Sequence, residues 1–185
     1  MKCWSDDLAA FLAAVWAELG DYTRARAGYP GLVTLATRGS GGPELRQVVL
    51  RKTDRANAQL VLHTDSDSHK VAELAADPAV SLLAWNPEHQ LQIRVRGRAE
   101  ILGPYAAETI WSSLPFASQG NYGVTPAPGT PIAAASDYQR VPDKGRLAVV
   151  VIGVGEIDAV HLAEPHHIRA RFRAEEGWAG EWLAP

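Results

Sequence analysis

The stretch from Arg46 to Lys70 constrains the fold most, because it has the pattern of two strands, a tight turn and the start of a helix. Its two apolar arms are residues 48–50 and 60–62, and residues 54–58 between them favour a reversal of the chain. Ser68 is a good residue to open the helix that follows. A unit of this kind indicates an antiparallel sheet with a helix at one end.

Several other runs have the length and composition of strands. They are residues 31–37, 44–52, 80–85, 90–102, 146–157 and part of 161–174. Short turns join most of them, and strands and helices do not alternate regularly along the chain. The sequence therefore predicts a mainly β fold with flanking helices (α+β), in which six or seven strands form an antiparallel barrel.

A helical segment is predicted over residues 1–28. Apolar side chains recur with helical spacing from Leu8 to Leu19, Ser5 is the expected N-cap, and Gly20 is the expected end of the helix. This apolar stripe is typical of core packing.

One domain is expected over residues 1–185, since this length suits a single hydrophobic core. Residues 114–145 are rich in Pro, Gly, Ser and Asn, and they predict a long loop. A loop of this length in a compact domain is usually a lid, a binding loop or an arm that wraps a partner subunit.

Composition excludes several classes of function. Net charge is −3, so the chain lacks the basic excess typical of nucleic-acid or anionic-membrane binding. No apolar run is long enough to span a bilayer, and no signal-peptide pattern is found. Cys3 is the single cysteine, which favours a reducing compartment, and we expect a cytoplasmic protein. The histidines lack metal-ligand spacing, so no metal site is predicted.

Polar groups at the ends of the 46–70 unit suggest an anion site. Arg46, Thr64, Ser68 and Lys70 bring a guanidinium, two hydroxyls and an ammonium near a helix N-terminus. These groups are suited to a phosphate monoester. A hairpin whose charged ends are simply solvated explains the same residues equally well.

The strand around residues 90–102 has a strongly basic face. Apolar and polar residues alternate there, so that Gln92, Arg94, Arg96 and Arg98 share one side. This face is either solvated, bound to an anionic ligand or in contact with a partner subunit, and Gln92 has the groups to bind the edge of a heterocycle.

With its motifs in this order, the chain resembles the pyridoxamine 5'-phosphate oxidase-like family of FMN-binding split-barrel proteins, and in particular its broader flavin-binding branch. The likeness covers roughly residues 31–185. The matching motifs are Arg46-Gln47-Val48-Val49-Leu50-Arg51, His63-Thr64, Ser68-His69-Lys70, Leu91–Gly97 and Trp178–Pro185.

The resemblance implies an FMN-binding split barrel that forms a homodimer with FMN at the subunit interface. In this family Arg46, Thr64, Ser68 and Lys70 would hold the phosphate, and the backbone of residues 48–50 would lie along the flavin ring. The implied cofactor-binding residues are Arg46, Val48, Val49, Leu50, Arg51, His63, Thr64, Ser68, His69, Lys70, Gln92 and Trp178.

Departures from the family pattern concern the substrate more than the flavin. Trp182 stands where the true oxidases have an arginine, and the arginine-x-histidine pair that faces the vitamin appears reversed, as His167 and Arg169. Arg51 replaces the motif lysine, and His69 replaces the arginine of the phosphate turn. We therefore expect poor oxidation of pyridoxamine phosphate.

Three hypotheses follow for the function. The first is an FMN-dependent oxidoreductase that passes a hydride between flavin and a small organic substrate, with no side chain assigned as catalytic. The second is a non-catalytic flavin- or haem-binding carrier or sensor on the same barrel. The third is a deazaflavin-dependent reductase.

Overall fold

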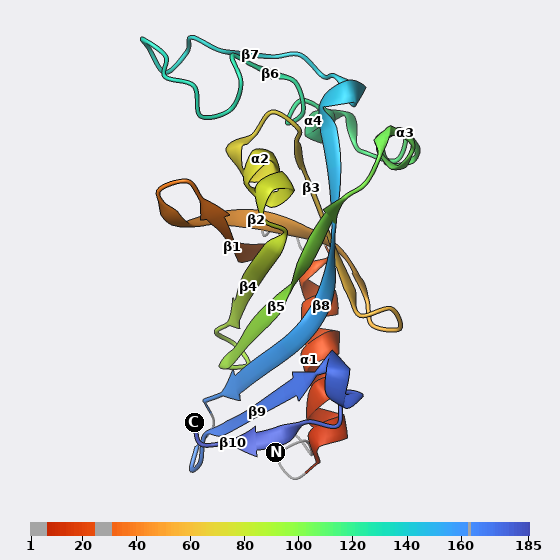
Figure 1. Cartoon of the computed structure of the whole chain (residues 1–185), viewed down its shortest axis with the longest axis vertical. Helices are drawn as coiled ribbons and strands as arrows, with labels where there is room; N and C mark the ends of the chain where they lie inside the picture. The colour runs from red at the N-terminus through yellow and green to blue at the C-terminus, as the bar shows by residue number, and fades with distance from the viewer. Residues whose placement is uncertain (1–6, 25–30, 163) are drawn as a thin grey trace.

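An antiparallel sheet closes into a barrel and forms most of the molecule (Figure 1). The computed structural model describes residues 7–24, 31–162 and 164–185. The strands of the main sheet are β1 (Leu32–Gly39), β2 (Gly42–Asp54), β3 (Gln59–Asp65), β4 (Ala79–Asn86), β5 (Leu91–Ile101), β8 (Leu147–His161), β9 (Ile168–Arg173) and β10 (Glu181–Leu183). Their order is β10-β9-β8-β3-β2-β1-β4-β5, and β8 also pairs with β5.

The β8–β5 pairing closes a barrel of six strands, while β9 and β10 extend the sheet beyond it. The predicted six- to seven-stranded antiparallel barrel with flanking helices is therefore confirmed. Strand β8 is long enough to serve both parts. Its first half pairs with β3, and its second half pairs with β9.

Helix α1 (Leu8–Tyr22) packs along the β9–β10 end of the barrel (Figure 1). Phe11, Val15 and Leu19 on one face are buried in the main core. The Phe11 ring lies edge-on to Phe172 and stacks on Trp182, with ring centroids 6.3 Å and 5.9 Å apart. The apolar stripe predicted from the sequence therefore serves core packing.

The ends of α1 differ from the prediction. The carboxylate of Asp7 caps the N-terminus by accepting from the amide of Ala9 at 2.9 Å, whereas Ser5 lies outside the described residues. The helix continues past Gly20 to Tyr22, so the predicted end is wrong. The amide and hydroxyl of Thr23 both donate to the carbonyl oxygen of Gly20, which caps the helix without a left-handed glycine.

The 114–145 region forms short pieces of structure at the other end of the barrel. Helix α3 (Pro104–Trp111) leads into it, followed by α4 (Phe116–Gln119), β6 (Val124–Thr125), β7 (Gln139–Arg140) and the 3₁₀ turn η1 (Lys144–Arg146). A second 3₁₀ turn, η2 (Ala174–Glu176), connects β9 to β10. The small β6–β7 pair projects away from the barrel at the top of Figure 1.

Buried Asp65 anchors this loop region at two points, beside helix α2 (His69–Ala76). Its carboxylate accepts from the amide of Gly123 at 2.8 Å and from the guanidinium of Arg146 at 2.7 Å and 3.0 Å. Burial raises the pKa of Asp65, but the amides of Gly123 and Asp67 together with Arg146 outweigh this effect and hold the pKa below its ordinary value. The loop is therefore tied to the end of β3, next to α2.

Candidate functional site

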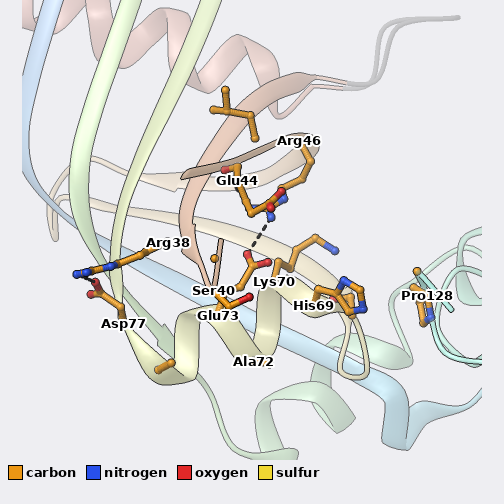
Figure 2. Close-up of a pocket in the computed structure, with 15 residues that line it drawn as sticks. Arg38, Ser40, Glu44, Arg46, His69, Lys70, Ala72, Glu73, Asp77 and Pro128 are labelled. Carbon is orange, nitrogen blue, oxygen red and sulfur yellow. Dashed lines mark hydrogen bonds and ion pairs between the residues drawn. The ribbon is translucent and has the colours of Figure 1, made fainter. Parts of the chain in front are cut away.

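A cleft of about 1050 Å³ lies between helix α2 and the β1–β2 hairpin (Figure 2). Arg38, Glu44 and Arg46 line it from the hairpin, and Ser68, His69, Lys70 and Glu73 line it from α2 and its N-cap. Pro128 and Gly129 of the long loop form a further part of its wall. Three of the four residues predicted to hold the phosphate thus line one cavity, namely Arg46, Ser68 and Lys70, and the fourth, Thr64, is hydrogen-bonded to Lys70.

Lys70 is the centre of a cluster of hydroxyl groups at the start of α2. Its ammonium donates to the hydroxyl of Thr64 at 3.0 Å, and that hydroxyl lies 3.3 Å from the hydroxyl of Ser68. Ser68 is the N-cap residue, but its hydroxyl donates to the carbonyl oxygen of Asp65 at 2.6 Å and makes no bond to the helix amides. Those amides stay available to an anion.

The charge on Lys70 is only partly balanced. Among the described residues it forms no ion pair with a carboxylate, and its one hydrogen bond goes to a neutral hydroxyl. Burial lowers its pKa, and the positive charge of nearby Arg46 lowers it further, while Asp65 and Glu73 raise it. A bound anion would relieve this unfavourable electrostatic environment.

Strand β2 offers an unpaired backbone edge beside this cluster. On one side it pairs with β1 along residues 42–49, but on the other side its ladder with β3 begins only at Leu50. In the described part of the chain, no strand pairs with residues 46–49 on that second side. The backbone predicted to lie along the flavin therefore has N–H and C=O groups free to bind a ligand's polar edge.

Arg46 is held by Glu73 and Thr37, two residues that the sequence motifs do not include. Its Nη2 donates to Oε2 of Glu73 at 2.8 Å, its Nη1 donates to the hydroxyl of Thr37, and that hydroxyl donates to the same Glu73 oxygen at 2.5 Å. Thr37 is buried, and the side chains of Arg46 and Glu73 are only 21% and 14% exposed. The i, i+3 spacing of Lys70 and Glu73 was a signal that both face the cleft.

A second polar group surrounds Arg51, which sits at a bulge in β2 between Leu50 and Lys52. Burial lowers the pKa of His63 to about 4, with a further contribution from the charge of Arg51, so this imidazole is neutral at pH 7. Burial also raises the pKa of Tyr122, a loop residue that interacts with Arg51. In the part of the chain that the structure describes, Nε of Arg51 and Nδ1 of His63 are buried without a hydrogen-bond partner, so the group has unused binding capacity.

His69 packs against the long loop instead of joining the hydroxyl cluster. A Cβ placed on Gly129 would lie 2.8 Å from the His69 ring, and Gly129 has φ +91. Only glycine is free of both the clash and the backbone strain at this position. The residue that replaces the motif arginine is thus matched to a glycine in the loop.

Two predicted residues lie apart from the cleft within one chain. Gln92 pairs with Trp85 of β4 and Val160 of β8, at the opposite end of β5 from α2. Trp178 packs against the core near β10, and β10 lies at the opposite end of the molecule from α2 in Figure 1. Their roles in binding a cofactor stay predictions.

The basic face of β5 is largely neutralised. Asp158 of β8 is bonded by Arg94 and by Arg169 of β9, the latter at 2.9 Å and 3.1 Å. Arg96 lies 3.4 Å from a carboxylate oxygen of Glu156. This face was predicted to be solvated, to bind an anionic ligand or to contact a partner subunit. These contacts support the binding of an anionic ligand least.

Other site types find little support in the part of the chain that the structure describes. It holds no group of three or more His, Cys, Asp or Glu side chains placed to bind a metal ion. Likewise, none of its helices combines the length and apolar character needed to cross a bilayer.

Comparison with known proteins identifies the family. The model of the pyridoxamine 5'-phosphate oxidase FMN-binding domain matches residues 9–103. The chain belongs to this family. A pyridoxine/pyridoxamine 5'-phosphate oxidase of Mannheimia succiniciproducens is 28% identical over 90% of this chain and 85% of its own length. One from Kineococcus radiotolerans is 32% identical over 70% of this chain, but the match spans 57% of that relative.

Two solved structures share the fold of this family member. An FMN-binding, pyridoxamine 5'-phosphate oxidase-related protein of Nostoc punctiforme has a TM-score of 0.72 at 21% identity, covering 95% of this chain and 96% of its own. PhzG of Burkholderia lata, in complex with tetrahydrophenazine-1-carboxylic acid, has a TM-score of 0.76 at 19% identity and covers 100% of this chain and 98% of its own. The predicted split-barrel fold is confirmed.

FMN is the cofactor of this pyridoxamine 5'-phosphate oxidase family domain. The cleft fits it chemically, because a phosphate matches Lys70, the neighbouring hydroxyls and the free amides of α2. The unpaired edge of β2 matches the polar rim of the flavin ring.

Proposed function

We propose that this protein is an FMN-dependent oxidoreductase acting on a small organic substrate, and that it is not a true pyridoxamine phosphate oxidase. The observation that carries the proposal is the ammonium of Lys70, which bonds to the hydroxyl of Thr64 and has no carboxylate partner among the described residues. It lies beside the unpaired edge of β2. The bound FMN supplies the redox chemistry by accepting or giving a hydride. The residues of the chain bind and orient the cofactor and the substrate.

Arg51 is the proposed substrate contact. It forms no ion pair among residues 7–24, 31–162 and 164–185, and its buried Nε lacks a partner. An uncompensated guanidinium on β2, beside the backbone proposed to carry the flavin, favours a substrate with an anionic group. Neutral His63 next to it offers a ring nitrogen for a hydrogen bond at pH 7.

Two departures argue against pyridoxamine phosphate as the substrate. The indole of Trp182 is stacked on Phe11, and it offers one N–H donor where arginine offers a charged fork of five. The guanidinium of Arg169 is held by Asp158. We expect peroxide formation from pyridoxamine phosphate to be far below the ordinary enzyme range of ~1–10³ per second. A turnover within that range would contradict this part of the proposal. Trp182→Arg alone is not expected to restore oxidation of pyridoxamine phosphate, because His167 and Arg169 still stand in the reverse order of the family's arginine-x-histidine pair.

We further propose a homodimer in which the partner completes the cofactor site, with the whole chain acting as one cytoplasmic domain. The distance of Gln92 and Trp178 from the cleft in one chain supports this arrangement. So do the apolar side chains of Leu32, Leu83 and Trp85, which are exposed on the neighbouring strands β1 and β4. Sedimentation at micromolar concentration tests it. A monomer that still binds FMN tightly would contradict the proposed dimer.

The central experiment records the absorption spectrum of the purified protein and then follows reduction of its bound flavin without oxygen. The proposal expects a flavin spectrum with FMN bound in preference to riboflavin, and reduction by a nicotinamide or an organic donor. Flavin that no donor reduces would favour a carrier or sensor. Tighter binding of a deazaflavin than of FMN would favour the deazaflavin-dependent reductase.

A further inference from the structure

We propose that Glu73 is a positioning residue for the cofactor: with Thr37 it holds Arg46 ready to bind the phosphate of FMN. This inference rests on the proposed placement of FMN in the cleft and concerns residues outside the matched motifs. Figure 2 shows the side chains of Arg46 and Glu73 facing each other across the cleft wall, joined by their ion pair.

The contacts leave part of the Arg46 guanidinium available. Nη1 reaches the hydroxyl of Thr37 and, at 3.4 Å, the carbonyl oxygen of Glu44, while Nη2 reaches Glu73 at 2.8 Å. A guanidinium has five N–H donors, so donors remain for a phosphate after these contacts are made. Glu73 and Thr37 also bind each other, which closes a three-membered network.

Such a network lowers the entropy lost on binding. A long, flexible arginine that is already held in one conformation does not have to be ordered when the ligand arrives. Lys70 lies within electrostatic reach of Arg46, and both line the same cleft. Glu73 therefore fixes one phosphate donor, and its negative charge also moderates the repulsion between the two cations.

The alternative is that Glu73 competes with the phosphate for Arg46, or that the ion pair serves only folding. The three cases differ in how they affect FMN and riboflavin, which share a ring and differ in the phosphate. Removing a positioning residue lowers the preference for FMN over riboflavin, and removing a competitor raises it. Removing a purely structural residue weakens the binding of both ligands together.

The test measures dissociation constants for FMN and riboflavin by flavin fluorescence titration on the full chain and its variants. Glu73→Ala is expected to weaken FMN by about two- to tenfold and to leave riboflavin unchanged, because Arg46 must then be ordered on binding. Glu73→Gln keeps an acceptor oxygen for Arg46 and is expected to retain the preference. Thr37→Val, which removes only the hydroxyl, is expected to lower the preference less than Glu73→Ala.

Glu44→Gln is the matched control. It removes the charge of a residue that lines the same cleft. The contact of Glu44 with Arg46 is made by the backbone carbonyl oxygen, which the substitution keeps. No loss of FMN preference is expected there. A wild type that binds riboflavin as tightly as FMN would overturn the proposed function and this inference together.

If wild type prefers FMN, three results would overturn the inference alone. One is a Glu73→Ala protein whose preference is unchanged or larger. Another is a Glu73→Ala protein that loses both ligands equally. The third is a Glu73→Gln protein that loses as much of its preference for FMN as Glu73→Ala does.

Discussion

The cleft beside α2 and the outer face of β5, β8 and β9 both collect basic side chains, but they differ in the acids that surround them. On the outer face, buried Asp158 is shared by Arg94 and Arg169, and Glu156 is shared by Arg96 and Arg173. In the cleft, Arg46 has Glu73, whereas Lys70 has only hydroxyl oxygen as a direct partner among the described residues.

The difference in carboxylate partners indicates where an anion is expected to bind. A cation whose position is fixed by shared carboxylates gains little from a second anion, because the exchange replaces one favourable contact by another. Arg46 differs, since it keeps donors beyond those bound to Glu73 and Thr37. A partly desolvated cation beside hydroxyls and free helix amides gains a charge-assisted contact that no described residue of the chain provides. Both regions carry basic residues, and the placement of the acids separates their roles.

Removing the ammonium of Lys70 should have the largest effect on this contrast. Lys70→Ala is expected to weaken FMN about 10- to 100-fold, since a charge-assisted phosphate contact contributes roughly 1.5–3 kcal/mol, and to leave riboflavin unchanged. Lys52→Ala, on an exposed part of β2, is the matched control and should leave both dissociation constants as they are. Equal loss of FMN in the two variants would mean that general charge, and not the cleft, governs affinity.

Asp158→Asn should instead affect folding. Burial raises the pKa of Asp158, but hydrogen bonds and charge from Arg169 and Arg94 outweigh it, so the folded-state pKa lies below the ordinary 3.8. We expect chemical denaturation at pH 7 to show a loss of about 1–2 kcal/mol in the free energy of unfolding, a value reduced because the arginines are partly in solvent. FMN affinity should not change.

The sign of the pH dependence follows from that lowered pKa. A carboxylate with a depressed folded-state pKa stabilises the protein fully above its unfolded pKa, and the contribution is lost as pH falls through the folded pKa. The stability difference between wild type and Asp158→Asn should therefore shrink from about pH 5 downward. A difference that is constant down to pH 2 would rule out the ionised carboxylate as its source.

Gly129→Ala should give a smaller effect, confined to the cleft. The new Cβ would clash with His69 at a positive φ, so we expect a loss of about 1 kcal/mol of stability and a modest weakening of FMN. Gly41→Ala is the matched control, because a Cβ there meets no atom of the described residues within 4 Å. Thermal unfolding and flavin titration measure both quantities. Identical behaviour of the two variants would show that the loop does not form part of the cofactor site.

Arg98→Ala should have the smallest effect of all. This exposed arginine is on the basic face of β5 and forms no ion pair within the described ranges. We expect a change within about 0.5 kcal/mol in stability and none in FMN affinity. A marked loss of FMN affinity would indicate that the basic face of β5 binds an anion after all.

Sequence patterns predicted most of the fold because strand alternation and helix spacing are local. The 90–102 alternation became β5, and the apolar stripe starting at Leu8 became α1. The end of α1 was missed because the amide and side chain of Thr23 cap the helix beyond Gly20, a contact that propensity does not reveal. The extension of the sheet by β10 depends on pairing with β9 across a turn.

The candidate site was predicted only in part. Arg46, Thr64, Ser68 and Lys70 do converge, since one compact unit of chain carries them all. Glu73, Thr37 and Tyr122 escaped notice because their contacts join residues far apart in sequence. The pairing of Arg94 with Asp158, 64 residues away, likewise depends on which strands become neighbours.

The length of β8 has a consequence for the time scale on which the protein opens. From Val150 to Ile152 this strand is flanked by β3 and β5, and from Glu156 to His161 by β5 and β9. Each amide in these stretches points into one ladder or the other, and neither stretch lies at an open edge, whereas β10 lies at the edge of the sheet. In deuterated water, the protons of β8 should therefore be the last to exchange, at the rate of global unfolding.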